Sequence, residues 1–323
     1  MEKKLDISVV VPLLNEEESL PELLEWIQRV MKENGFAYEV VFVNDGSTDG
    51  SWRLIRGFAA RHPEVKGICF SCNYGKSAAL NEGFKLAQGE VVITMDADLQ
   101  DSPDEIPKLY KGIVEGGYDL ISGWKKKRYD PLSKTIPSKL FNWVNKKISG
   151  IELHDQNCGL KAYRKIVVKN VSLHGEMHRY IPVLAKWRGF NKIGEQVVEH
   201  RARKFGSTKF GLERFINGFL DLLSITFVTK FRKRPMHFFG TIGTLSFLVG
   251  FVSTCWIIGA KLYNLAHSLP FRDVTEQPLF YISLTMLIVG AQMFLTGFIA
   301  EMMAMNSHKE DDYLIVERAG DND

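Results

Sequence analysis

The chain has 323 residues, a formal net charge of +3 and four cysteines. So small a positive charge does not indicate a nucleic-acid-binding protein, and four cysteines, one of them within an apolar run, do not form the disulfide framework of a small secreted domain. Because the length exceeds that of a typical single domain, we expect one core of moderate size plus an appended segment.

The N-terminus has no recognisable secretory signal. Residues 1–6 lead into an apolar run at 7–11 that is too short and too rich in β-branched side chains for the apolar region of a signal peptide. We therefore expect the N-terminal part of the protein to remain in the cytoplasm.

Short β-branched runs alternate with amphipathic stretches over the first 122 residues. We expect strands at 7–11, 39–43, 67–70, 91–95 and 118–122, and helices at 17–32, 52–61 and 78–87. This alternation predicts an α/β fold with a mostly parallel sheet and crossover helices.

Polar side chains follow three of the expected strands. They lie at residues 15–16, 44–47 and 96–98, directly after the first, second and fourth strand. Ligands of such sheets bind at the carboxyl ends of the strands, and these ends meet at one edge of the sheet. The three clusters therefore predict a single site.

The cluster after the fourth strand has the composition of a metal site. Asp96, Asp98 and Gln100 bring two carboxylates and an amide close together, and the carboxylates would repel each other without a cation between them. Oxygen ligands favour Mg²⁺ or Mn²⁺ over zinc. Such an ion would neutralise the charge that grows on a departing diphosphate; a solvated loop is the alternative.

Asp45 ends the second strand, where its carboxylate can accept hydrogen bonds from a nucleobase. Gly46 permits a tight turn, and Ser47 or Thr48 can cap the next helix. Lys76 follows the third strand and would add a cation near the nucleotide; the alternative is an ordinary surface lysine.

Two segments have the composition of helices that lie on a membrane surface. In residues 132–149 lysines alternate with large apolar side chains, and residues 205–235 lead into a long apolar run. The alternative is that the apolar side chains of these segments pack onto the sheet.

Residues 238–260 and 278–300 contain no Asp, Glu, Lys or Arg and are long enough to cross the hydrocarbon core of a membrane. Basic residues at 230–234 precede the first run, whereas residues 263–277 between the runs carry only Arg272. This asymmetry predicts that both termini face the cytoplasm. Two buried core helices are the alternative, but nothing else in the chain is large enough to surround them.

The motifs together resemble those of family 2 glycosyltransferases of the dolichyl-phosphate mannose synthase and undecaprenyl-phosphate glucosyltransferase type. The likeness runs from residues 11–16 through 44–47 and 96–101 to 155–165 and 201–209, and it includes the two-helix membrane anchor. Each motif is modest alone, but their order and spacing are specific. The resemblance implies a GT-A fold, a nucleotide-sugar donor, a divalent metal, inversion at the anomeric carbon and a polyprenyl phosphate acceptor.

On this resemblance the chain divides into four parts. Residues 1–204 form the GT-A catalytic domain, residues 205–235 a juxtamembrane helix, and residues 236–304 a two-span transmembrane hairpin. Residues 305–323 form a cytoplasmic tail, which we expect to be solvated and mobile because it is mostly acidic.

The resemblance also implies roles for individual residues. Asp45 would contact the base, whereas Asp96, Asp98 and Gln100 would hold the metal and the diphosphate. The other residues assigned to substrate binding are Pro12, Asn15, Glu16, Gly46, Lys76, Ser207 and Lys209. Arg128 and Arg201 would bind phosphate groups, with Arg128 placed where the acceptor phosphate enters.

Asp155 matches the candidate general base of the family. A phosphate monoester is already ionised near neutral pH, because its second pKa is about 6. We therefore expect Asp155 mainly to position a substrate, while Arg128 and Arg201 hold two anions in line for the reaction.

Other interpretations remain open. A catalytically silent nucleotide-binding scaffold could have the same fold, whereas a processive polysaccharide synthase would carry a longer membrane channel and a Gln-x-x-Arg-Trp motif, which the sequence lacks. UDP-glucose is the first expectation for the donor, with GDP-mannose or a UDP-linked amino sugar as alternatives. Ser246 and Gly250 have the spacing of small residues that associate helices, and a homo-oligomer such as a tetramer is a further expectation.

Overall fold

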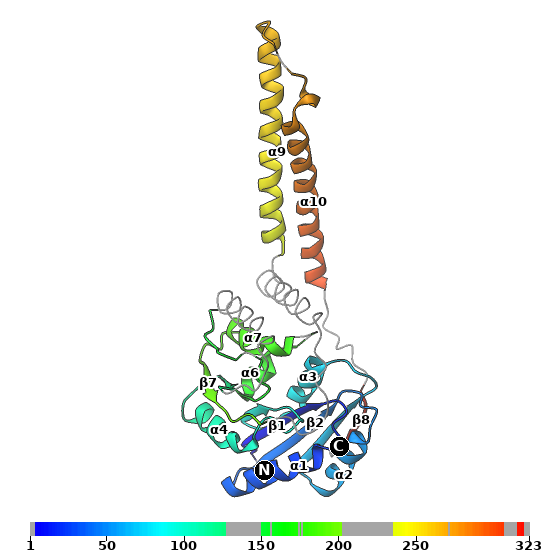
Figure 1. Ribbon diagram of the computed structural model, residues 1–323, viewed down its shortest axis with the longest axis vertical. Helices are drawn as coiled ribbons and strands as arrows, with labels where there is room; N and C mark the ends of the chain where they lie inside the picture. The colour runs from blue at the N-terminus through cyan, green and yellow to red at the C-terminus, as the bar shows by residue number, and fades with distance from the viewer. Residues whose placement is uncertain are drawn as a thin grey trace. The chain divides into compact units, whose positions relative to one another are not determined.

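The computed structural model describes residues 4–126, 150–155, 157–173, 175, 177–201, 235–270, 272–306 and 315–319. The chain forms two compact units. The first contains Met1–Leu223 and Asp312–Asp323, and the second contains Ser224–Asp311. The first is an α/β unit, and the second is a pair of long helices (Figure 1).

The first unit is built on a sheet whose strand order, within the described residues, is β7-β5-β6-β4-β1-β2-β3-β8. The strands are β1 (Ile7–Leu13), β2 (Tyr38–Asn44), β3 (Val65–Phe70), β4 (Val91–Thr94), β5 (Leu120–Trp124), β6 (Lys161–Arg164), β7 (Ile193–Val197) and β8 (Ile315–Ala319). β1 pairs in parallel with β2 and β4, and β2 with β3. The predicted α/β class is confirmed, with a sheet that is mixed because β6 and β8 run antiparallel to their neighbours.

Helices cover both faces of the sheet. They are α1 (Leu20–Asn34), α2 (Ser51–Arg61), α3 (Lys76–Leu86), α4 (Ile106–Val114), α6 (Lys165–Asn170) and α7 (Ile181–Trp187), with 3₁₀ turns η1 (Pro103–Glu105) and η2 (Met177–Tyr180). Buried side chains of α1, α2 and α4 share one hydrophobic cluster, and those of α3, α6 and α7 share another. The first unit therefore has three layers, with the sheet in the middle (Figure 1).

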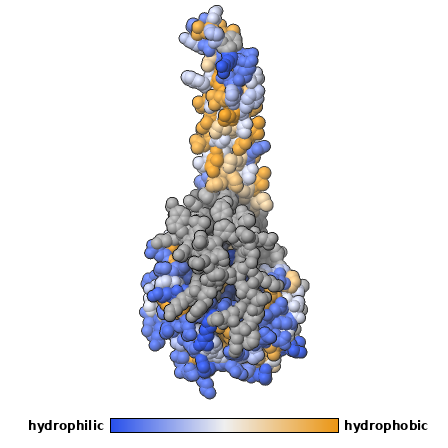
Figure 2. All heavy atoms as spheres, viewed as in Figure 1, coloured by the Kyte–Doolittle hydropathy of each residue, from blue (hydrophilic) through white to orange (hydrophobic). Residues whose placement is uncertain are grey.

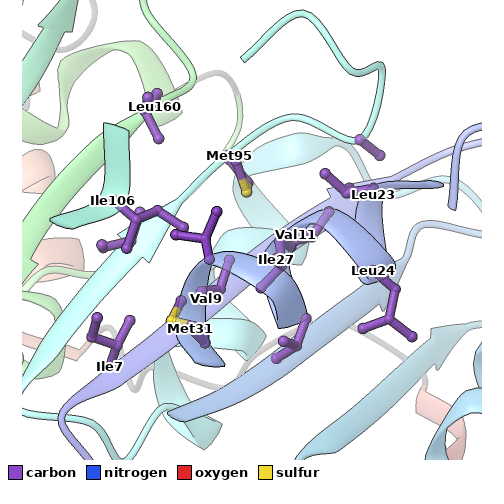
Figure 3. Packing of buried hydrophobic residues seen from close by; sticks show 14 of the residues in the cluster. Ile7, Val9, Val11, Leu23, Leu24, Ile27, Met31, Met95, Ile106 and Leu160 are labelled. Carbon is purple, nitrogen blue, oxygen red and sulfur yellow. The ribbon is translucent and has the colours of Figure 1, made fainter. Parts of the chain in front are cut away.

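β1 lies at the centre of both hydrophobic clusters. Ile7, Val9 and Val11 contribute to the cluster below α1, whereas Val10 contributes to the cluster on the opposite face. This follows from the two-residue period of a strand, which sends successive side chains to opposite faces. Figure 3 shows Ile27 and Met31 of α1 against the first of these faces.

The topology brings the expected ligand-binding clusters to one edge of the sheet. β1, β2 and β4 are parallel and end at Leu13, Asn44 and Thr94, so the loops that follow them share that edge. β6 runs in the opposite direction, and its first residue, Lys161, pairs with Thr94. The start of β6 therefore lies at the same edge as the ends of the parallel strands.

The C-terminal tail differs from the expectation of a solvated, mobile end. Residues Ile315–Ala319 form β8, which pairs antiparallel with β3. The unpaired backbone groups of an edge strand favour the addition of another strand. The end of the tail is thus part of the sheet of the first unit.

The second unit consists of α9 (Pro235–Ala266), the 3₁₀ turn η3 (Val274–Glu276) and α10 (Pro278–Asn306). Both helices are long and apolar enough to cross a membrane, and apolar side chains dominate their surface (Figure 2). Only 17% of the most apolar window of each helix is buried. A buried core helix would be covered on all sides, so these helices are candidate membrane spans.

Small residues set the contact between α9 and α10. The Ser246 hydroxyl donates a hydrogen bond to the Met286 carbonyl oxygen at 3.0 Å. A Cβ at Gly250 would lie 2.7 Å from the Ser283 carbonyl oxygen. Ser246 and Gly250, whose spacing predicted helix association, thus associate the two helices of one hairpin.

Two predicted segments cannot be compared with the structure. The possible membrane-surface helix at 132–149 lies outside the described residues, as does nearly all of the juxtamembrane helix expected at 205–235. Both stay predictions.

Candidate active site

The loops that follow β1 and β2 hold each other in place. The backbone N–H of Asn15 donates to the Ser47 hydroxyl at 2.9 Å, and the backbone N–H of Thr48 donates to the Asn15 side-chain oxygen at 2.8 Å. Asn15 has a φ of 56°, a left-handed conformation that asparagine adopts more readily than most residues. Asn15 therefore connects the two loops, and its side-chain oxygen is already engaged by one of them.

The start of α2 differs from the sequence prediction. Its N-cap is Gly50 rather than Ser47 or Thr48. The Gly50 N–H donates to the Glu17 carboxylate at 2.8 Å, so a side chain from the β1 loop satisfies it. The prediction that Ser47 or Thr48 caps the helix is wrong, because both residues are bound to Asn15 instead.

Asp45 is buried at the end of β2, with 5% of its surface exposed. Its carboxylate accepts hydrogen bonds from the backbone N–H groups of Tyr74 at 2.8 Å and Gly75 at 2.9 Å. Burial raises the pKa of Asp45, and these two hydrogen bonds partly oppose the rise. Gly46 follows with a φ of 69°, as the predicted tight turn requires. Asp45 thus fixes the loop between β3 and α3.

The residue after Gly75, Lys76, contacts the first of the two predicted metal-binding aspartates, Asp96. The Lys76 ammonium, at the first position of α3, donates a hydrogen bond to the Asp96 carboxylate. About a third of each side chain is exposed, 33% for Lys76 and 34% for Asp96. Burial raises the pKa of Asp96, but the charge and hydrogen bond of Lys76, together with the charges of Lys125 and Lys161, exceed this effect and lower the pKa.

The residues expected to hold a metal lie on a short loop after β4. Ala97 and Leu99 are buried and anchor the loop, whereas Asp96, Asp98 and Gln100 are partly exposed. The Gln100 N–H donates to the Asp98 carboxylate at 3.2 Å. No cluster of three acidic, histidine or cysteine side chains with metal-site geometry occurs in the described part of the chain. An all-oxygen set with few protein ligands fits Mg²⁺ or Mn²⁺, which take their remaining ligands from water and phosphate.

The loop before β6 lies directly against Asp96. A Cβ at Gly159 would be 2.6 Å from the Asp96 carboxylate, so a side chain here would require the loop or the carboxylate to shift. The loop itself is held by Asp155, which is 1% exposed and whose carboxylate accepts the Asn157 N–H at 3.1 Å. The Asp155 N–H in turn donates to Glu195 of β7 at 2.9 Å. Asp155 therefore shapes the wall of the site from a buried position.

A pocket opens beside Asp96 on the side of the sheet that α3 and α7 cover. Its lining is Pro12, Lys76, Leu80, Thr94, Met95, Asp96, Asn157, Cys158, Gly159, Lys161, Tyr163, His178, Arg179 and Ile181. The predicted residues in this lining are Pro12 of β1, Lys76 of α3 and Asp96 from the loop after β4. Lys76, Lys161 and Arg179 place three basic side chains around the partly exposed Asp96 carboxylate. Such a lining suits an anionic ligand.

Two of the pocket residues are titratable groups whose pKa values are lowered. The Lys161 ammonium donates to the Cys158 carbonyl oxygen, and burial lowers the pKa of Lys161. The His178 ring lies 3.1 Å from the Ser77 hydroxyl. Burial, together with the charges of Lys76 and Arg179, lowers the pKa of His178 to about 2. His178 is therefore neutral at physiological pH, whereas Lys76 supplies a positive charge.

Arg201 and Lys125 lie beside the same loop but have different partners. The Arg201 guanidinium lies over the Trp26 ring at 4.2 Å from its centroid and 3.6 Å from the Glu199 carboxylate. Lys125 pairs with the buried Asp101 at 3.0 Å. Burial lowers the pKa of Lys125, but Asp101, Cys158 and Asp96 together exceed this effect and raise the pKa. Of these contacts, the pairing of Lys125 with Asp101 stabilises the loop after β4.

The structure thus brings Pro12, Lys76, Asp96 and the loop of Asp98 and Gln100 together at one edge of the sheet. Asp45 binds the backbone of Gly75, next to Lys76. Arg128, Ser207 and Lys209 lie outside the described residues. Gly159, Lys161 and His178 were not among the predicted site residues. Gly159 and Lys161 belong to a motif that was noted at 155–165, whereas no local pattern marked His178.

Comparison with known proteins identifies relatives over the whole chain. Residues 8–172 match the model of the family described as Glycosyl transferase family 2. The dodecaprenyl-phosphate galacturonate synthase of Rhizobium johnstonii is 35% identical over 316 residues, which are 96% of this chain and 90% of that protein. The undecaprenyl-phosphate 4-deoxy-4-formamido-L-arabinose transferase of Aeromonas hydrophila is 36% identical over 79% of this chain and 77% of its own length.

Solved structures share the fold. Glucosyl-3-phosphoglycerate synthase of Mycobacterium tuberculosis, in complex with phosphoglyceric acid, superposes with a TM-score of 0.55 at 18% identity, covering 70% of this chain and 80% of that one. The GT-A-like sheet is therefore that of a known glycosyltransferase architecture. Taken with the family match, the chain belongs to glycosyltransferase family 2 and is a glycosyltransferase.

Proposed function

We propose that this enzyme transfers a sugar from a nucleotide-sugar to a polyprenyl phosphate, such as undecaprenyl phosphate, at the cytoplasmic face of a membrane. The observation that carries the proposal is the extent of the likeness to the Rhizobium relative. Because it covers 96% of the chain, it includes α9 and α10 as well as the edge with Asp96 and Asp98. A membrane anchor and a lipid acceptor belong together, since both substrates must meet at the membrane surface.

The proposed reaction is a single displacement. An oxygen of the acceptor phosphate attacks the anomeric carbon of the sugar, and the bond between that carbon and the nucleoside diphosphate breaks with inversion. The nucleoside diphosphate departs with the electron pair of that bond. The acceptor is already ionised, so Asp155, which is buried and holds the loop before β6, positions that loop rather than accepting a proton.

Asp96, Asp98 and Gln100 would hold Mg²⁺ or Mn²⁺, and the ion would neutralise charge on the departing diphosphate. Other residues of the chain would bind the nucleotide. Asp45 would contact the base, and Lys76, beside Asp96, would add a positive charge to the diphosphate site. Arg128, Arg201, Ser207 and Lys209 remain predicted phosphate ligands.

UDP-glucose is the donor expected from the sequence, and a UDP-linked uronic acid is a second candidate. The pocket beside Asp96 favours the second, because its lining includes Lys76, Lys161 and Arg179. A carboxylate on the sugar would find opposite charges there. The Rhizobium relative is named for a galacturonate.

The test is glycolipid formation by the full-length protein. The purified protein in detergent is incubated with undecaprenyl phosphate, Mg²⁺ or Mn²⁺, and a panel of UDP-glucose, UDP-galacturonate, UDP-4-deoxy-4-formamido-L-arabinose and GDP-mannose, and products are identified by mass spectrometry. One accepted donor would support the proposal and identify the sugar. Asp98→Ala is the control, since it removes a predicted metal ligand. Metal-dependent nucleotide binding with no glycolipid from any donor would favour the silent scaffold.

A further inference from the structure

Residues Tyr74, Gly75 and Lys76 contact both carboxylates that the proposed function assigns to the donor. The N–H groups of Tyr74 and Gly75 donate to Asp45. One residue further on, the Lys76 ammonium donates to Asp96. A single short segment of the chain therefore engages the expected base ligand and the expected metal ligand together.

The contact between Lys76 and Asp96 has a direct consequence for a metal. Its acceptor is Oδ1 of Asp96, one of the two oxygens that the side chain can offer to a cation. The lysine ammonium is a compact point charge. It therefore neutralises the carboxylate charge of Asp96 that would otherwise attract a divalent ion. Asp96 is also partly exposed, which leaves it accessible to an ion that displaces Lys76.

We propose that Lys76 is an internal counter-cation of Asp96 that the metal displaces, so the nucleotide-free protein binds a divalent ion weakly. The inference rests on the proposed metal role of Asp96. Lys76 lines the pocket beside Asp96 together with Lys161. Once displaced, its ammonium therefore remains in a position to meet the phosphates that arrive with the metal.

Asp45 positions Lys76 through the backbone. The two N–H groups that bind Asp45 immediately precede Lys76 in the chain. Gly75, one of these two residues, has a φ of 93°, and apart from its chain neighbours no heavy atom lies within 4 Å of where its Cβ would be. The segment therefore has open space beside it and a glycine backbone, which together allow Lys76 to move when a ligand competes for Asp96.

The test measures Mn²⁺ binding to the full-length protein in detergent, without nucleotide, by the electron paramagnetic resonance signal of free Mn²⁺. Lys76→Met should bind Mn²⁺ at least about fivefold more tightly than the wild type, the lower end of typical coupling between two sites. Lys76→Arg keeps the charge and should bind as the wild type does. Lys85→Met is the matched control, because Lys85 lies on the same helix but pairs with Glu82.

Further variants separate the possible outcomes. Adding Asp96→Asn to Lys76→Met should abolish the gain, because the gain acts through that carboxylate. Lys76→Gln serves as a second uncharged variant if Lys76→Met does not fold. Equal Mn²⁺ affinity in wild type and in the uncharged variants would overturn the inference, as would Mn²⁺ binding that Asp96→Asn does not change. Glycolipid formation is assayed separately, so a failure of the proposed reaction is distinguished from a failure of this inference.

Discussion

Gly159 determines how closely the loop before β6 approaches the Asp96 carboxylate. A Cβ at this position would lie 2.6 Å from Asp96 Oδ2 and 2.7 Å from Asp96 Cγ. Contacts this short force either the loop or the carboxylate to move. Since Lys76 binds the same carboxylate, a displacement of Asp96 also disturbs the segment that Asp45 holds.

We therefore expect Gly159→Ala to reduce kcat/KM by about 100-fold, the cost of a displacement near 1 Å at a reacting centre. The measurement is initial-rate kinetics with the accepted donor. Gly57→Ala is the control, because the nearest atom to a Cβ at Gly57 is a flexible arginine terminus at 3.8 Å. A Gly159→Ala variant with wild-type kinetics would show that the loop adapts without disturbing Asp96.

His178 should make no contribution to the pH dependence of the reaction. Its pKa is lowered to about 2 by burial and by the charges of Lys76 and Arg179. A base with a depressed pKa gains its proton only as the pH falls to that value, so the ring stays neutral from about pH 5 to 8. In His178→Gln we expect kcat/KM to fall while the shape of its pH profile stays that of the wild type. An acidic limb with a midpoint near 6.5 that disappears in the variant would contradict this.

At the scale of elements, local pattern predicted β1 to β5 and failed for β6 to β8. The first five strands carry β-branched runs, and polar clusters follow three of them. β6 has only four residues, two of them basic, and β7 contains a glycine, a glutamate and a glutamine. β8 lies in an acidic tail and forms because β3 offers an edge almost 250 residues earlier in the sequence. Such strands depend on their tertiary partners rather than on local propensity.

The α9–α10 pair depends on the absence of a side chain at Gly250. A Cβ there would lie 2.7 Å from the Ser283 carbonyl oxygen, whereas no heavy atom lies within 4 Å of a Cβ at Gly259. We expect Gly250→Leu to separate the helices and to lower the free energy of unfolding of the hairpin by about 1–3 kcal/mol, the usual cost of overpacking. Gly259→Leu is the matched control and should be neutral. Thermal unfolding of both variants in detergent is the measurement, and equal midpoints would contradict the expectation.

For the whole molecule, the position of the site could be predicted but its full membership could not. The expected strand ends indicated residues 15–16, 44–47 and 96–98, because the edge of a parallel sheet is fixed by topology. His178 reaches the site only through the fold, since its partner Ser77 is 101 residues away in the sequence. The contact between Lys76 and Asp96 could not be predicted either, because a lysine at the start of a helix is ordinarily solvated.

The chain's path also predicts the topology of the protein in a membrane. β8 follows α10 and joins the sheet of the first unit through β3, so two membrane crossings by α9 and α10 leave residues 267–277 on the opposite side. In Thr275→Cys, whose side chain is exposed in η3, we expect a membrane-impermeant maleimide to label intact spheroplasts. The exposed Cys72 of the first unit should be labelled only after the membrane is permeabilised. Labelling of Cys72 in intact spheroplasts would show that the orientation is the opposite one. Protection of both positions would show that the loop lies within the membrane.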